Sequence, residues 1–261
     1  MYFIFFTISF LASIVGSICG IGGGIIIKPA LDTLGLLNVS SISFLSGCTV
    51  LAMSAISIYQ NFKVDHHSIS LRLSTPLALG AALGGILGKN LFQYIYVILP
   101  NHNMVGAIQA SVLIIITLAS LIYTINTKRI RTHHLNNTPF IFLVGLTLGL
   151  ISAFLGIGGG PINLVFLEYF FSIDSKKAAS NSLYIIMISQ LASLISTIVS
   201  NHVPDIEIVI IIIMAFGGLI GGILGSKLHQ KISIKNVHRL FIGLMIIIIG
   251  INLTNIYRFI F

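Results

Sequence analysis

The chain has 261 residues, of which 56% are hydrophobic and only 8% are charged. Soluble domains carry about 25% charged residues, so this composition excludes a soluble globular protein. Together with a mean hydropathy of +1.05, it predicts an all-α integral membrane protein. The formal net charge of +8 indicates loops that face anionic lipid headgroups, and we expect no nucleic acid partner.

Apolar runs divide the chain into a first membrane repeat (residues 1–125), a basic polar linker (126–138) and a second membrane repeat (139–261). About eight runs approach the roughly 20 apolar residues that a bilayer-spanning helix needs, four in each repeat. They lie at roughly residues 3–20, 41–61, 73–96, 104–125, 139–156, 178–200, 206–228 and 237–257. Two shorter apolar segments, residues 25–37 and 161–171, are predicted to be half-helices or re-entrant pieces.

Each short segment follows the same cluster, Gly-Ile-Gly-Gly-Gly. The cluster occupies residues 20–24 and occurs again, 136 positions later, at residues 156–160. A glycine inside a helix costs roughly 1 kcal/mol relative to alanine, and unpaired backbone groups in lipid cost several kcal/mol each. The duplication predicts that each cluster breaks a membrane helix and turns backbone amides toward a buried anion. The alternative is that the clusters only form tight bends or helix contacts.

A second matching pattern places glycines at i, i+4 and i+8 in the third and seventh spans, at residues 80, 84 and 88 and at residues 217, 221 and 225. Such side-chain-free faces favour tight helix packing, with pathway lining as the alternative. Four full crossings in each repeat would give the two repeats the same orientation in the membrane, and we favour this parallel arrangement. If the short segments also cross, each repeat has five crossings and the two repeats are inverted. Basic residues divide eight against six between the two sides, which favours external termini only slightly.

The candidate substrate-binding residues lie in and beside the two clusters. Lys28 could balance the charge of the anion or snorkel to the headgroups. The polar side chains could instead cap helices or bond between them. The full set is Gly22, Gly23, Gly24, Gly158, Gly159, Gly160, Lys28, Ser46, Thr49, Asn163, Asn181 and Ser182.

Asp32 and Glu168 are candidates for proton coupling, because carboxylates within a membrane usually have a functional role. Both could instead lie in water at the far end of a short segment. The histidine pairs 66–67 and 133–134 lack ligands at metal-binding spacing and are expected to be solvated. We therefore expect no metal site and no cofactor. The spans contain no nucleophile triad or paired catalytic carboxylates, which argues against an enzyme.

The first cluster with the following Ile25–Leu31 resembles the signature of the sulfite exporter TauE/SafE family, and so does Gly156–Leu167 followed by Ser175–Leu183. Two departures are Ser180-Asn181-Ser182, where Thr-Ser is more usual, and Val165, at the position that matches Pro29. The resemblance implies a multi-pass permease of the inner membrane for sulfite, sulfonates or related organosulfur anions.

From the residues and the resemblance together, we expect a secondary transporter for a small anion that works by alternating access around the duplicated helix breaks. Its partners would be the anionic substrate and the lipid bilayer, and its oligomeric state is open. The alternatives are a passive anion channel, which would use the same glycines as a constriction, and a non-transporting membrane scaffold.

Overall fold

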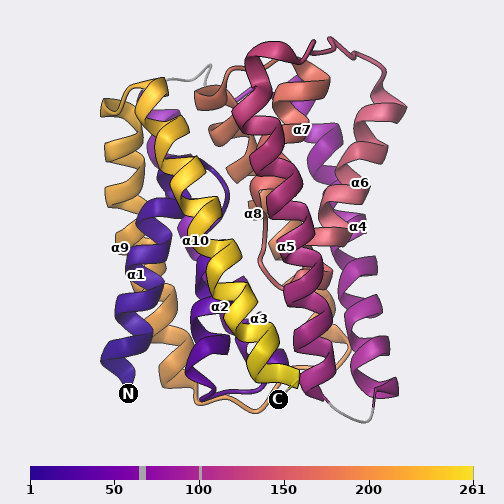
Figure 1. Ribbon diagram of the computed structural model, residues 1–261, viewed down its shortest axis with the longest axis vertical. Coiled ribbons are helices and arrows are strands. Elements are labelled where there is room, and N and C mark those ends of the chain that lie inside the picture. The colour runs from indigo at the N-terminus through magenta and orange to yellow at the C-terminus, as the bar shows by residue number, and fades with distance from the viewer. Residues whose placement is uncertain (65–68, 100–101, 261) are drawn as a thin grey trace.

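The computed structural model describes residues 1–64, 69–99 and 102–260, and within these ranges the chain forms helices and no strand (Figure 1). Eight helices are long, and two are short. The long helices are α1 (Tyr2–Cys19), α3 (Val39–Val64), α4 (Leu71–Ile98), α5 (His102–Asn126), α6 (Thr138–Leu155), α8 (Ser175–Val199), α9 (Ile208–Lys231) and α10 (Ile234–Ile260). The short ones are α2 (Gly24–Leu34) and α7 (Pro161–Phe171), and a 3-10 turn (Thr127–Arg129) follows α5.

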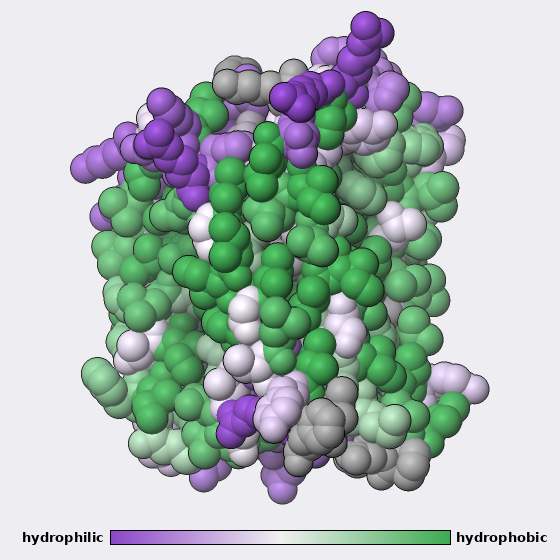
Figure 2. Space-filling model, viewed as in Figure 1, coloured by the Kyte–Doolittle hydropathy of each residue, from purple (hydrophilic) through white to green (hydrophobic). Residues whose placement is uncertain are grey.

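The long helices are apolar enough to cross a membrane. Each of the eight is at least 18 residues long and contains an 18-residue stretch as apolar as a membrane span. Figure 2 shows a broad apolar band around the middle of the molecule and hydrophilic residues gathered toward its ends. The predicted all-α membrane fold with eight spans is therefore confirmed.

The short helices follow sharp turns at glycine. α1 ends at Cys19, and Gly20 then adopts a left-handed φ of 70°. α6 ends at Leu155, and Gly156 adopts a left-handed φ of 66°. Glycine reaches this conformation without a steric penalty, so local chemistry ends both helices. Pro161 begins α7, where its missing N–H leaves no donor unpaired.

Corresponding helices of the two halves run in opposite directions. Along the contact between α3 and α8, Gly47 lies beside Gln190, whereas Asn61 donates a hydrogen bond to Ser180 at 3.3 Å. A higher number on α3 thus pairs with a lower number on α8. The two termini lie at the same end of the molecule (Figure 1).

The expectation of parallel halves is therefore wrong, and α2 explains why. Thr33 near the end of α2 donates to Asn255 near the end of α10, at 2.8 Å, so α2 descends toward the end that carries both termini. α1 rises from that same end, and α2 brings the chain back. Each half consequently contains five segments of alternating direction, and the second half begins at the opposite end.

The glycine faces of α4 and α9 bring helices of different halves together. A Cβ on Gly80, Gly84 or Gly88 would overlap backbone atoms of α6, and Gly217, Gly221 and Gly225 of α9 lie similarly close to α1. This close approach confirms the predicted tight packing. The partner in each case is the first helix of the other half, so the two halves are interlocked.

Inversion also collects most of the basic residues at one end of the molecule, which we call the basic end. It is the end that does not carry the termini, uppermost in Figures 1 and 2. Eleven of the 14 basic residues lie in the loops and helix ends there: Lys63, Arg72, Lys128, Arg129, Arg131, Lys176, Lys177, Lys227, Lys231, Lys235 and Arg239. The expected eight-to-six division is therefore wrong, because it followed from parallel halves.

Candidate functional site

The two glycine loops, residues 20–24 and 156–160, lie against one another in the interior. A Cβ on Gly24 would overlap the carbonyl oxygen of Ile157, and one on Gly159 would lie 3.0 Å from the carbonyl oxygen of Ile21. Only residues without a side chain allow two backbones to approach this closely. Clusters that are far apart in the sequence thus form one central contact.

This contact lies near the middle of the long helices. A Cβ on Gly22 would lie 3.5 Å from the side chains of Val50 and Ile186. Val50 is near the middle of α3, and Ile186 is near the middle of α8. Since both helices span the molecule, the loops cross close to its midplane.

Main-chain amides are left free where both short helices begin. Among the described residues, the amides of Gly24, Ile25 and Ile162 make no backbone hydrogen bond outside their own helix, whereas those of Ile26 and Asn163 do. These N–H groups lie at the positive end of the helix dipole. They form the kind of donor set that binds oxyanions at helix N-termini.

Polar side-chain atoms without a partner surround the loops. They include Ser46 Oγ of α3 and Asn163 Oδ1 of α7, both buried. Beside Gly158 lies a cavity of about 10 Å³, lined by Asn163, Ser152 and Ser189 among others. A space of that size holds about one water molecule. In this conformation the centre is polar and closed.

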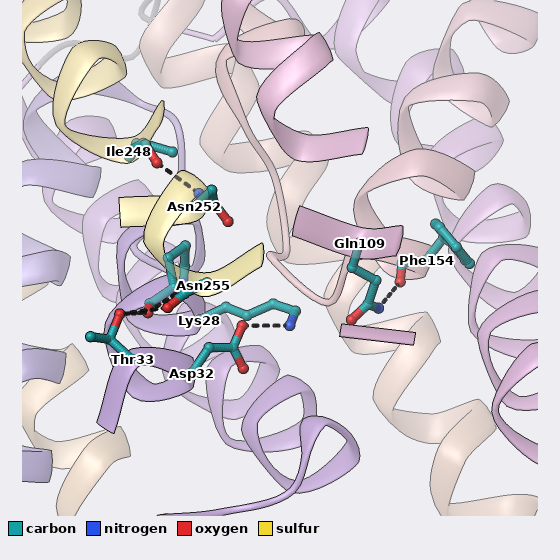
Figure 3. Close-up of polar contacts among 9 residues, drawn as sticks. Lys28, Asp32, Thr33, Gln109, Phe154, Ile248, Asn252 and Asn255 are labelled. Atoms are coloured by element: carbon teal, nitrogen blue, oxygen red, sulfur yellow. Dashed lines mark hydrogen bonds and ion pairs between the residues drawn. The ribbon is translucent and has the colours of Figure 1, made fainter. Parts of the chain in front are cut away.

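A buried ion pair lies on α2, one turn beyond its start. Lys28 Nζ is 3.0 Å from Asp32 Oδ2, and the two side chains are 3% and 4% exposed (Figure 3). A spacing of four residues places both on one helix face. Lys28 therefore does not snorkel to the headgroups and is not a free charge, and Asp32 does not lie in water.

Polar contacts fasten the carboxyl half of α2 to α10. Asn255 donates to the carbonyl oxygen of Pro29 at 2.9 Å and accepts from Thr33 at 2.8 Å (Figure 3). Asp32 Oδ1 has no hydrogen-bond partner. One carboxylate oxygen thus remains available for a proton or a water molecule.

Glu168 lies at the basic end, unlike Asp32. It is half-buried near the end of α7 and hydrogen-bonds with the side chain of Ser175. The two candidate proton carriers therefore belong to different ends of the molecule. They do not form one carboxylate pair.

Asn181 fastens α8 to α4. Its Oδ1 accepts from the Ser70 amide at 2.9 Å and from the Ser74 hydroxyl at 2.5 Å, while its Nδ2 donates to the carbonyl oxygen of Lys177. The α8 cap is instead Asp174, whose Oδ1 accepts from two amides at 3.1 Å. The helix-capping alternative for Asn181 is therefore wrong.

The remaining candidates have different surroundings. Thr49 Oγ1 donates within α3 to the carbonyl oxygen of Leu45, and Ser182 Oγ is buried without a partner. His133 packs edge-on against Tyr169, with ring centroids 5.2 Å apart. The pair at positions 66–67 lies outside the described residues. In the described part of the chain, no three His, Cys, Asp or Glu residues form a metal-binding group.

Three buried amide side chains belong to this region although the sequence analysis did not select them: Gln109, Gln190 and Asn255. A Cβ on Gly158 would lie 2.9 Å from Gln190 Nε2, so Gln190 packs on the second glycine loop. Gln109 donates to the carbonyl oxygen of Phe154 at 2.5 Å (Figure 3). A lone amide inside an otherwise apolar span was the signal that could have identified them.

The family model for the sulfite exporter TauE/SafE matches residues 5–253. The chain belongs to the TauE/SafE family. Curated relatives of this TauE/SafE protein include the probable membrane transporter protein MJ0441 of Methanocaldococcus jannaschii, which is 28% identical over 88% of this chain and 87% of its own. Another is the probable membrane transporter protein YunE of Bacillus subtilis, 23% identical over 96% and 98%. No solved structure matches the chain.

Family membership and the eight spans together identify a multi-pass membrane transporter. The family match covers both glycine loops and both short helices. The central contact between the loops is therefore contained within the part of the chain that the family shares.

Proposed function

We propose that this TauE/SafE protein is a secondary transporter that moves a small oxyanion, sulfite or a sulfonate, by alternating access. The observation that carries the proposal is the mid-membrane contact of two glycine loops beside helix N-termini with free amides. Several N–H donors can bind the oxygens of one anion without a net protein charge. Because the halves run in opposite directions, an exchange of their conformations would open the centre to the other side.

Asp32 couples this transport to protons in the proposed mechanism. With Asp32 charged, Lys28 is neutralised at 3.0 Å, and no net positive charge attracts the anion. A proton on Asp32 would remove that neutralising charge and leave the Lys28 ammonium to pair with the anion. Glu168, at the other end, is the candidate that exchanges a proton with the basic side.

The basic end faces the cytoplasm in this proposal, and the protein lies in the inner membrane. Loops on the cytoplasmic side carry an excess of Lys and Arg. Eleven of the 14 basic residues lie at the basic end, and both termini lie at the other. The termini are therefore outside.

Flux measurements in proteoliposomes test the proposal. Purified protein should give saturable uptake of sulfite or isethionate that depends on an imposed pH gradient. Gly24→Ala should abolish uptake, because its Cβ would overlap the carbonyl oxygen of Ile157 and part the loops. Gly250→Ala is the matched control, since a Cβ there meets nothing within 4 Å.

Two results would contradict the mechanism. Full uptake by Gly24→Ala would show that close contact of the loops is unnecessary. Flux that rises linearly with anion concentration and ignores the gradient would indicate a passive channel instead. Uptake of neither anion would refute the substrate assignment.

A further inference from the structure

A large cavity opens at the basic end, far from the glycine loops. Its volume is about 470 Å³, and it lies where α4, α6 and α8 begin. Three residues with basic side chains line it: Arg72 of α4, His134 of the connection before α6, and Lys177 of α8. We call this cavity the vestibule.

The described residues that line the vestibule carry a net positive charge. None of the described residues that line it is acidic. The ion pair found among the described residues is Lys28–Asp32 in α2, and neither Arg72 nor Lys177 forms an ion pair with a described carboxylate. Cations that share a concave, partly apolar cavity attract anions from solution more strongly than cations spread over a convex surface.

A neighbouring cavity provides an internal comparison. It measures about 340 Å³ on the other side of the start of α8 and is also lined by Lys177, together with Lys176 and His229. Asp174 lines it as well, and Lys176 Nζ donates to the carbonyl oxygens of Gln230 and Ile232 at 3.0 and 3.3 Å. Asp174 therefore offsets one of its two lysine charges, and this cavity should select anions less strongly than the vestibule does.

The vestibule points along α8 toward the central cavity. Lys177 and Asn181 line the vestibule, and Ile185 and Ser189 line the small cavity beside Gly158. These four residues follow one another in steps of four and form a single stripe on α8. The vestibule and the central cavity thus lie along the same face of α8.

Residues of α4 also line both cavities, and an apolar side chain of α4 separates the two. Leu73 lines the vestibule, and Ala81 lines the central cavity. Leu77, one turn from each, is fully buried and packs in one apolar cluster with Val144 and Ile185. An anion in the vestibule is thus separated from the central cavity by about two helical turns of packed apolar side chains.

We propose that the vestibule is a docking site for the oxyanion on the basic side, distinct from the central glycine site, and that a path opening between α4, α6 and α8 leads from one to the other. Arg72, Lys177 and His134 attract and hold the anion before that path opens. This docking step deepens the transport function proposed above and rests on it.

Charge-selective thiol labelling tests the docking site without requiring transport. In protein with Cys19 and Cys48 replaced by alanine, Thr138→Cys places one exposed thiol in the vestibule. Ile234→Cys places a control thiol in the neighbouring cavity. Each purified variant is reacted with the sulfonatoethyl and the trimethylammonioethyl methanethiosulfonates, which are matched reagents of opposite charge.

The ratio of the anionic to the cationic reaction rate should be about tenfold higher at Thr138→Cys than at Ile234→Cys, and it should fall as salt is raised. Adding Arg72→Gln and Lys177→Gln should remove most of the difference, whereas Lys235→Gln, elsewhere on the basic end, should not. Sulfite or isethionate at millimolar concentration should slow the anionic reagent. Asn136→Cys replaces Thr138→Cys if that variant does not fold.

Equal ratios at the two thiols, or a preference that survives loss of both cations, would overturn the docking site whatever the flux assay shows. A preference that depends on Arg72 and Lys177 supports the site even if sulfite is not transported, because the labelling needs no transport. In the flux assay, Arg72→Gln and Lys177→Gln should each raise the half-saturating concentration from the basic side at least threefold. An unchanged value would also overturn it.

Discussion

Replacing Lys28 with Met should destabilise the protein strongly, because the buried Asp32 carboxylate would lose its partner. At 3.0 Å, two unit charges attract by about 5.5 kcal/mol at an effective dielectric constant of 20. Removing each ion from water costs several kcal/mol, so the intact pair contributes little net stability. When one partner is removed, the desolvation penalty of the remaining buried charge is no longer offset, and such losses cost about 3–5 kcal/mol.

The double variant separates this penalty from lost packing. Asp32→Asn alone strands the Lys28 ammonium and should also cost about 3–5 kcal/mol, whereas Lys28→Met with Asp32→Asn leaves no buried charge. The double variant should therefore be more stable than either single variant, which requires a coupling energy larger than about 3 kcal/mol. Lys235→Met, on an exposed side chain, is the control and should lie within about 0.5 kcal/mol of the wild type.

The assay is unfolding of purified protein in mixed micelles by increasing fractions of dodecyl sulfate, followed by circular dichroism. Single variants as stable as the wild type would show that the pair is not buried. Additive single and double effects would show that the two side chains do not interact.

Three further predictions concern packing and topology. Gly24→Ala should lower stability by about 1–3 kcal/mol in the same assay, since its Cβ would overlap a carbonyl oxygen, while Gly250→Ala should not. Asn181→Ala should cost about 1–3 kcal/mol, because Ser74 and the amide of Ser70 lose a buried acceptor; a smaller loss than that of Thr254→Ala would contradict this. In intact cells, an epitope at either terminus should bind antibody without permeabilisation, and an epitope inserted beside Lys231 should not.

Local chemistry explains the parts of the fold that were predictable from the sequence. Eight apolar runs became eight long helices because a helix satisfies its backbone hydrogen bonds within itself, whatever surrounds it. Gly20 and Gly156 end α1 and α6 because glycine alone reaches the left-handed conformation freely. The i, i+4 spacing of Lys28 and Asp32 is likewise visible in the sequence.

The burial of that pair was not visible, because it depends on α10. Asn255 holds α2 from a position more than 200 residues later, and no local pattern links the two. The same holds for the vestibule, where Arg72, His134 and Lys177 come from three separate segments. From its neighbours in the sequence alone, each of the three would be expected to be a solvated cation in a loop or at a helix end.

By itself, the sequence determined that this protein is a membrane protein of eight spanning helices, with two glycine bends at matching places. Only the tertiary structure decided that the halves are inverted, that the two bends touch and that the basic residues share one end. The physical reason is that the length and the ends of a helix depend on residues that are neighbours in the sequence. The direction of each later helix depends instead on whether the short helices α2 and α7 carry the chain back toward the end from which it came. Lipid is as apolar as the helices, so hydrophobicity does not decide which helices pack together. Glycine faces such as Gly80–Gly88 decide it, and the sequence does not show which helix each face will contact.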